Sequence, residues 1–320
     1  MDNNGNELDP PGVDGVKRAL VLPGGGGRGA YQVGVYKALH ERGIKFDLAL
    51  GTSIGALNAA MIAQGDLERL ENLWGSLRSK DVFRLPNAQQ LSHMLLGQKL
   101  GLLDSTPLEQ ILRREADLQK LKASQMKVYL FTTDLCSLET RMIAVDEIMS
   151  TNELIDAFMA TSAVPMAFPP RHLYGKGLWV DAGLVRNTPL QAAIDMGAEE
   201  IYMVLLNPDK VEACPANMWQ VIARCLDIVL DASAKKEIHL SELYNRLIVE
   251  GAAEARGRRR VNIHVFQPHK PVDTTLLEID PERSRRLIRQ GYDDAVEQLR
   301  EMERAAAPLV IGGEPAEMAP

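Results

Sequence analysis

The stretch Gly51-Thr52-Ser53-Ile54-Gly55 lies between two segments with different hydrophobic patterns. Residues 46–50 form a mostly apolar run typical of a buried strand, and residues 56–64 have the composition of a helix. A Gly-x-Ser-x-Gly motif in this setting is typical of a nucleophile elbow, in which the serine occupies a strained turn. Gly51 and Gly55 are then required because neighbouring backbone passes close to both. We therefore predict that Ser53 is a nucleophile at the edge of a sheet.

A glycine-rich loop, Gly24-Gly25-Gly26-Gly27-Arg28-Gly29, follows the apolar run 18–22 and precedes a helical pattern over 30–42. As G-x-G-x-x-G it is similar to a dinucleotide-binding loop, which also needs an acidic residue at the end of the second strand. Asp47 instead begins that strand. We favour an oxyanion hole, in which the N–H groups of Gly25 and Gly26 face a carbonyl oxygen attacked by Ser53. Arg28 would hold the loop by hydrogen bonds to nearby carbonyls.

The remaining pattern alternates strands with helices, which predicts an α/β fold with a mostly parallel or mixed sheet covered by helices on both faces. Further strands are expected over 126–132, 141–145, 200–206 and 261–266. We predict a single domain over 17–307, a disordered tail over 1–16 and a loose tail over 308–320. Within the domain, residues 79–124 are a candidate helical cap, and residues 216–305 a helical extension that contains a strand.

Composition narrows the functional classes. The 320 residues carry a formal net charge of −7, which argues against a general nucleic-acid binder. Three cysteines without metal-type spacing indicate reduced, buried thiols in the cytoplasm. We expect no signal peptide, and the longest apolar runs fall short of the roughly 20 residues that span a bilayer. Membrane contact is therefore expected to be peripheral.

Several segments together resemble the patatin-like phospholipase family, in the order found in that family. The resemblance extends from Val21 to about Leu206 and leaves the C-terminal third unassigned. The matching segments are VLPGGGGRGAYQVGVYKAL (21–39), LALGTSIGALNAA (48–60), TTDL (132–135), ATSAVPMAFPP (160–170) and DAGLVRNTPL (181–190).

The resemblance implies a three-layer α/β/α sandwich and a Ser–Asp dyad, with Ser53 as nucleophile and Asp181 as general base. It also implies hydrolysis of acyl esters in phospholipids or lysophospholipids through an acyl-enzyme, with no metal and no cofactor. One position departs from the family pattern, because Ala182 stands where the family usually has glycine. If that position required a positive φ, alanine would cost on the order of 1 kcal/mol.

Other interpretations remain open at this point. An α/β-hydrolase triad would use a histidine after the acid, for which His239, His264 and His269 are candidates. Acyl transfer would use the same site, and a non-catalytic lipid-binding or regulatory protein would keep only the fold. Oligomeric state is not predicted. Two arginine clusters could contact anionic headgroups if they share a face; they are Arg256, Arg258, Arg259 and Arg260, and Arg283, Arg285, Arg286 and Arg289.

Overall fold

The computed structural model describes residues 15–86, 92, 100–208, 214–216, 218–251 and 259–306. The two predicted tails lie outside these residues, apart from Gly15 and Val16. Within the described chain, the central feature is one eight-stranded sheet with the order β5-β6-β3-β2-β1-β7-β8 and with β4 paired to β3.

Five neighbouring strands of this sheet run parallel, which confirms the mostly parallel sheet expected from the sequence. Two further strands, β4 and β6, pair antiparallel with β3, and β5 pairs antiparallel with β6. The parallel strands are β1 (Arg18–Leu22), β2 (Leu48–Thr52), β3 (Lys127–Asp134), β7 (Glu200–Val204) and β8 (Asn262–Phe266). The antiparallel strands are β4 (Thr140–Ala144), β5 (Arg171–Leu173) and β6 (Lys176–Asp181).

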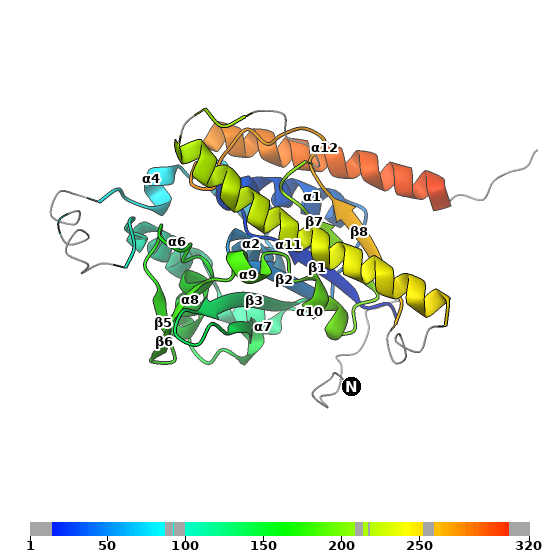
Figure 1. Cartoon of the computed structure of the whole chain (residues 1–320), viewed down its shortest axis with the longest axis horizontal. Helices are drawn as coiled ribbons and strands as arrows, with labels where there is room; N and C mark the ends of the chain where they lie inside the picture. Colours follow the sequence, from blue (N-terminus) through cyan, green and yellow to red (C-terminus); the bar gives the residue numbers. More distant parts are fainter. Residues whose placement is uncertain are drawn as a thin grey trace, which may run out of the picture.

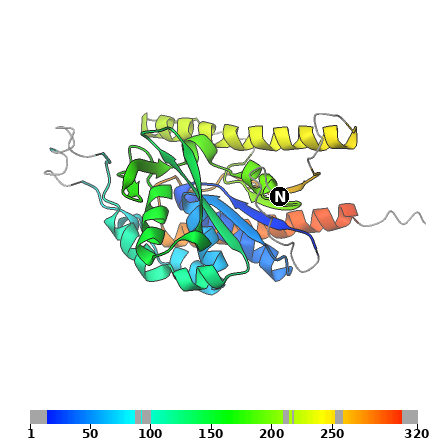
Figure 2. The ribbon, with the colours of Figure 1, turned by 90° about the horizontal axis from the view of Figure 1, so that it is seen from below.

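Helices cover both faces of the sheet (Figures 1 and 2). One face carries α1 (Gly29–Glu41), α2 (Ile54–Ala63), α3 (Leu67–Trp74) and α12 (Pro281–Ala306). The other carries α9 (Gly183–Arg186), α10 (Leu190–Asp195) and the long α11 (Met218–Val249). The other helical elements are η1 (Gly26–Arg28), α4 (Ser79–Val82), α6 (Thr106–Glu115), α7 (Leu118–Ala123), η2 (Val145–Glu147) and α8 (Thr151–Thr161).

Alternate residues of each strand enter two separate cores. Leu20 and Leu22 of β1 belong to the core between the sheet and helices α1 and α2. Ala19 and Val21 belong to the core on the other face, together with Leu190 of α10. This is the period of two that places successive side chains on opposite faces of a strand. The three-layer α/β/α sandwich is therefore confirmed.

The C-terminal helix α12 packs directly on α1. A β-carbon added to Gly34 would lie 1.9 Å from the Ile288 carbonyl oxygen, and one added to Gly291 would lie 2.2 Å from the Tyr31 carbonyl oxygen. The Tyr31 hydroxyl donates to Asp294 Oδ2 at 3.1 Å, and burial together with the Asp294 charge raises the pKa of Tyr31. The α12 helix in the C-terminal third is thus packed closely against α1.

Parts of the candidate cap also belong to the core. Leu108, Ile111 and Leu112 of α6 are buried in the cluster that contains α2 and α8, while residues 87–91 and 93–99 lie outside the described chain. The prediction of buried cysteines is wrong, because Cys136, Cys214 and Cys225 are all exposed. No helix among the described residues is long and apolar enough to cross a membrane.

Candidate active site

Ser53 forms the sharp turn between β2 and α2. Its backbone has φ 55° and ψ −130°, in the left-handed region that L-residues rarely adopt. A β-carbon on Gly51 would lie 2.4 Å from the Gly55 carbonyl carbon, and one on Gly55 would lie 2.1 Å from the Leu22 carbonyl oxygen. The strained serine and the close approach predicted for both glycines are therefore present.

The pairing of β3 brings Asp181 to Ser53. Thr52 at the end of β2 pairs with Phe131, and Asp181 at the end of β6 pairs with the next residue of β3, Thr132. Because β4 pairs with β3 over both stretches, β2 and β6 must share the other edge of β3. The two strands therefore meet end to end, which places Asp181, the last residue of β6, beside Ser53, the residue that follows β2.

Asp181 is buried, and the Ser53 side chain is hydrogen-bonded to it. Desolvation raises the pKa of Asp181 from 3.8 to about 6, although the hydrogen bonds from Ser53 and from the Gly183 N–H act in the opposite direction. The Gly183 N–H donates to Asp181 Oδ1 at 2.8 Å. The result is a carboxylate far more basic than an exposed aspartate.

Ala182 does not strain this turn. Its φ is −75° and its ψ is 0°, an ordinary right-handed conformation, and its side chain is buried in the core beside α10. Alanine would be costly here only if its φ were positive, and its φ is negative. The departure from the family pattern therefore leaves Asp181 in place.

Thr161, at the end of α8, holds the backbone of Ser53. Its Oγ1 accepts from the Ser53 N–H at 3.0 Å and donates to the Phe131 carbonyl at 2.7 Å, and the side chain is fully buried. Sequence reasoning did not single out Thr161, although it lies in the segment 160–170 that resembles the family.

The glycine loop leaves two of its N–H groups without an internal acceptor. Gly24 donates to Asn187 Oδ1 at 3.0 Å and Gly27 to the Leu276 carbonyl at 3.1 Å. The Arg28 and Gly29 N–H groups bond within η1. Within the described chain, the Gly25 and Gly26 N–H groups have no hydrogen-bond acceptor, and these are the pair that the sequence favoured.

Asn187 joins this loop to the neighbourhood of the acid. Its Oδ1 accepts from the Gly24 N–H, its Nδ2 donates to the Gly24 carbonyl at 3.4 Å, and the side chain is buried. A β-carbon on Gly24 would lie 2.9 Å from Ser53 Cβ, so the loop and the serine are in direct contact. Asn187 follows α9, which begins two residues after Asp181, and it was also missed from the sequence.

Arg28 holds the loop to α11. Its guanidinium donates to both carboxylate oxygens of Asp227, at 2.6 and 2.9 Å, and to Asn207 Oδ1 at 3.1 Å. Its Nε donates to the Thr274 carbonyl at 3.4 Å, the type of contact expected for this residue. The principal partner of Arg28 is nevertheless the Asp227 carboxylate. A bidentate pair of hydrogen bonds to a carboxylate is stronger than a single bond to a neutral carbonyl.

Residues 274–279, which we call the strap, cross over the glycine loop. A β-carbon on Gly26, whose φ is 55°, would lie 1.7 Å from the Leu276 carbonyl oxygen. A β-carbon on Gly27 would lie 2.1 Å from the Glu278 carbonyl oxygen. The run of glycines therefore allows one backbone to pass directly over another.

A buried polar network supports the loop from the opposite side. Asn58 donates to the Gly29 carbonyl at 2.9 Å and to Gln32 Oε1 at 2.8 Å, and it accepts from Trp74 Nε1 at 3.0 Å. Gln32 in turn donates to the Pro23 carbonyl at 2.7 Å. Such a satisfied network rigidifies the backbone to which it is attached.

An apolar cavity of about 80 Å³ lies between α2, α3, α6 and α8. The residues that line it include Ile54, which follows Ser53, and Met61 near the other end of α2. Leu57, Trp74 and Leu108 also line it. Its lining is almost entirely apolar and includes the residue that directly follows Ser53.

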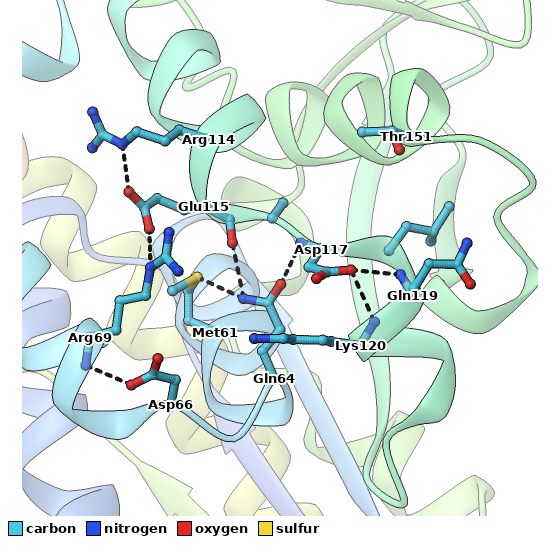
Figure 3. A pocket seen from close by; sticks show the side chains of 12 residues that line it. Met61, Gln64, Asp66, Arg69, Arg114, Glu115, Asp117, Gln119, Lys120 and Thr151 are labelled. Carbon is cyan, nitrogen blue, oxygen red and sulfur yellow. Dashed lines mark hydrogen bonds and ion pairs between the residues drawn. The ribbon is translucent and has the colours of Figure 1, made fainter.

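A more polar pocket of about 270 Å³ lies at that far end of α2 (Figure 3). Figure 3 shows Arg69 and Arg114 both directed at Glu115. Although burial opposes it, hydrogen bonds from these arginines lower the pKa of Glu115. Both cations are therefore engaged in a structural cluster, remote from Ser53, and we assign no chemistry to this pocket.

The alternative residues lie elsewhere. Asp47 accepts from the Arg18 N–H at the start of β1, at the end of the strand opposite the glycine loop, which argues against the dinucleotide interpretation. His239 is exposed on α11, and His264 in the edge strand β8 packs at a tilted angle against the Tyr202 ring of β7. His269 lies 3.4 Å from Asp294. In the described residues no hydrogen bond joins any of these histidines to Ser53 or Asp181. No cluster of potential metal ligands is found among the described residues either.

Relatives were found at both the sequence and the structure level. Lysophospholipase nte1 of Aspergillus terreus (strain NIH 2624 / FGSC A1156) is 62% identical over 45 residues, which cover 14% of this chain and 3% of that protein. Patatin-like phospholipase domain-containing protein 6 of Homo sapiens is 54% identical over 46 residues, with the same shares. The matched segment is thus a small part of these much longer relatives.

Among solved structures, VipD from Legionella pneumophila aligns with 94% of this chain and 72% of its own, at 14% identity and a TM-score of 0.48. The family model of the patatin-like phospholipases matches residues 20–194, which is more than half of the chain and contains the glycine loop, Ser53 and Asp181. The chain therefore belongs to the patatin-like phospholipase family.

Proposed function

We propose that this protein is a serine acyl hydrolase that cleaves the acyl esters of membrane lipids through a Ser53–Asp181 dyad. The observation that carries the proposal is the hydrogen bond between Ser53 and a buried carboxylate whose pKa is raised to about 6. Family membership supports a lipid ester as the substrate.

In the proposed reaction, Ser53 Oγ attacks the ester carbonyl carbon while its proton passes to Asp181. The carbonyl oxygen becomes an oxyanion, which accepts hydrogen bonds from the Gly25 and Gly26 N–H groups. Asp181 then gives the proton to the departing alcohol, which leaves the acyl group on Ser53. Water then attacks this acyl-enzyme while Asp181 takes its proton, and Asp181 returns that proton to Ser53 Oγ as the fatty acid departs, which regenerates the free site.

The raised pKa answers the main objection to an aspartate base. An ordinary aspartate is about 2.6 pKa units less basic than histidine, a deficit of roughly 3.5 kcal/mol. With a pKa of about 6, Asp181 comes close to the basicity of a free imidazole. The position of Asp181 in a buried turn thus supplies what a histidine supplies in a triad.

Phospholipids or lysophospholipids are the proposed substrates. The apolar cavity whose lining includes Ile54 supports this assignment, because it provides an apolar surface close to Ser53 in the chain. We place the protein in the cytoplasm, in peripheral contact with the membrane that holds its substrate.

A fluorophosphonate probe tests the proposal against a non-catalytic, lipid-binding role. The wild-type protein should be labelled at Ser53 and should hydrolyse a soluble p-nitrophenyl ester. Ser53→Ala should abolish both activities, and Asp181→Asn should abolish turnover while preserving the fold. An unlabelled wild-type protein, or turnover retained by Asp181→Asn, would contradict the proposal.

Product analysis separates hydrolysis from acyl transfer. After incubation with a mixed lipid extract, a hydrolase releases free fatty acid in proportion to the lipid consumed. Acyl chains recovered mainly on a second alcohol would instead assign the same site to a transferase.

A further inference from the structure

The outer face of α11 carries an apolar stripe in its first half. Met218, Val221, Cys225, Ile228 and Val229 recur at spacings of three or four residues, which places them on one side of a helix. All are exposed, with Met218 at 75% and Ile228 at 60%. Large apolar side chains concentrated on an exposed helix face usually mark an interaction surface.

The opposite side of α11 makes the contacts with the protein. Asp227 binds Arg28, Leu230 approaches Gly183, and Ala234 and Ser241 are buried. Figure 2 shows α11 as the outermost layer on its side of the sheet. The stripe thus points away from the described part of the molecule.

Exposed apolar side chains are also found on α9, which neighbours α11. Leu184 and Val185 are exposed, and α9 begins two residues after Asp181 and packs against α11. The stripe and α9 therefore lie over the edge of the sheet where Ser53 meets Asp181. We call this surface the apolar rim, and it comprises Leu184, Val185, Met218, Val221, Ile228 and Val229.

We propose that the apolar rim docks the protein on the surface of a lipid bilayer and so brings the Ser53 site to its substrate. The inference rests on the proposed function, because a substrate held in a bilayer must be reached across its surface. An amphipathic helix with a wide apolar face is suited to lie in the plane of the interface. The rim itself contains no charged residue, so its contact with lipid is apolar.

Charges further along α11 argue for a bilayer over a second copy of the chain. Lys235 and Lys236 are exposed near the middle of the helix, where Lys235 pairs with Asp231 while Lys236 adds a further positive charge. An antiparallel pairing over the length of α11 would place these lysines against their own copies. At a bilayer, lysine side chains can instead extend their ammonium groups into water.

The arginine cluster of α12 does not share this surface. Arg283 pairs with Glu278, Arg286 pairs with Asp273, and Arg285 donates to the Gly75 carbonyl. All three belong to α12, on the opposite face of the sheet from α11 (Figure 2). Of the other cluster, Arg256 and Arg258 lie outside the described residues. Docking through the rim is therefore expected to be largely independent of anionic lipid and salt.

Sedimentation with neutral phosphatidylcholine vesicles tests docking separately from catalysis. The full chain carries Ser53→Ala, so no lipid is consumed during the measurement. Adding Ile228→Glu should weaken partitioning at least about tenfold, since burial of an isoleucine side chain corresponds to that factor or more. Leu184→Glu, on the other element of the rim, should give a similar loss.

Met149→Glu is the matched control. Met149 is 80% exposed but precedes α8 at the end remote from Thr161 and the site, so its substitution should leave vesicle binding unchanged. With Ser53 intact, Ile228→Glu should retain hydrolysis of a soluble ester and lose hydrolysis of vesicle lipid.

Three outcomes would overturn the inference. They are absence of binding to neutral vesicles, equal binding by Ile228→Glu, and binding that requires anionic lipid and disappears in high salt. A dimer that Ile228→Glu dissociates, without vesicle binding, would instead assign the rim to a second copy. Failure of soluble-ester hydrolysis would refute the proposed function, whereas the vesicle result of the Ser53→Ala protein would still stand.

Discussion

Asp181 pairs with Thr132 one residue beyond the pair of Thr52 with Phe131, so that β6 and β2 meet end to end along the same edge of β3. The acid therefore reaches Ser53 through the register of a sheet and not through a flexible loop. A fixed register holds a catalytic pair more rigidly than a loop does. The same register keeps Asp181 away from water, which raises its pKa.

This burial predicts that Asp181 destabilises the fold at neutral pH. The folded-state pKa of about 6 lies above the unfolded value of 3.8, so the native state holds the proton more tightly, and stability falls as pH rises from about 4 to 6. The shift of about 2.2 units corresponds to roughly 3 kcal/mol. Asp181→Asn should therefore increase the free energy of unfolding by up to that amount at pH 7.5, and the gain should disappear near pH 4.

Urea denaturation at both pH values measures this effect. Asp134→Asn is the matched control, because hydrogen bonds from the Leu178 and Cys136 N–H groups lower the pKa of Asp134. That substitution should reduce stability at neutral pH. A loss of stability in Asp181→Asn at pH 7.5 would mean that the carboxylate is not buried as described.

The pH dependence of catalysis should follow the same group. Only ionised Asp181 can accept the Ser53 proton, so kcat/KM for an uncharged soluble ester should rise with pH, reach half its maximum near pH 6 and level off above about pH 7. The rate of fluorophosphonate labelling should show the same midpoint. A midpoint near pH 4 in both assays would indicate a solvated carboxylate.

Thr161→Val should impair the nucleophile without changing side-chain volume much. The substitution leaves the buried Ser53 N–H without its acceptor, at a cost of about 1–3 kcal/mol in stability. Release of the backbone should also lower kcat more than it raises KM. Thr161→Ser keeps the hydroxyl and should retain most of the activity, and equal activity of the valine and serine variants would remove Thr161 from this role.

Asp227→Ala should disrupt the glycine loop, although Asp227 lies far from that loop in the sequence. It leaves the nearly buried Arg28 without its carboxylate partner, which should cost about 2–4 kcal/mol and sharply reduce kcat. Asp231→Ala is the matched control on the same helix, because Asp231 pairs with the half-exposed Lys235. That surface pair should contribute less than about 1 kcal/mol, and thermal unfolding together with ester hydrolysis measures both variants.

Sequence reasoning was most successful where the signal is local. The apolar runs of β1, β2, β3 and β7 and the glycine pattern around Ser53 depend on residues adjacent in the chain. The expected free donors, Gly25 and Gly26, also follow from the position of one short loop between a strand and a helix.

The missed residues act across long separations. Asp227 meets Arg28 from a helix 199 residues further on, and Thr274 does so from 246 residues further on. Nothing in the sequence near either residue indicates which distant element it will contact. The concern over Ala182 failed for a related reason, since the φ of that residue is set by the β6–α9 turn and not by its motif.

The strap over the glycine loop imposes an order on assembly. Ser53 and Asp181 are both synthesised well before residues 274–279, which pack against Gly26 and Gly27. A nascent chain therefore contains Ser53 and Asp181 before the segment that packs over Gly26 and Gly27 has been made. If the proposed hydrolase function is correct, activity should begin only after the strap has been synthesised.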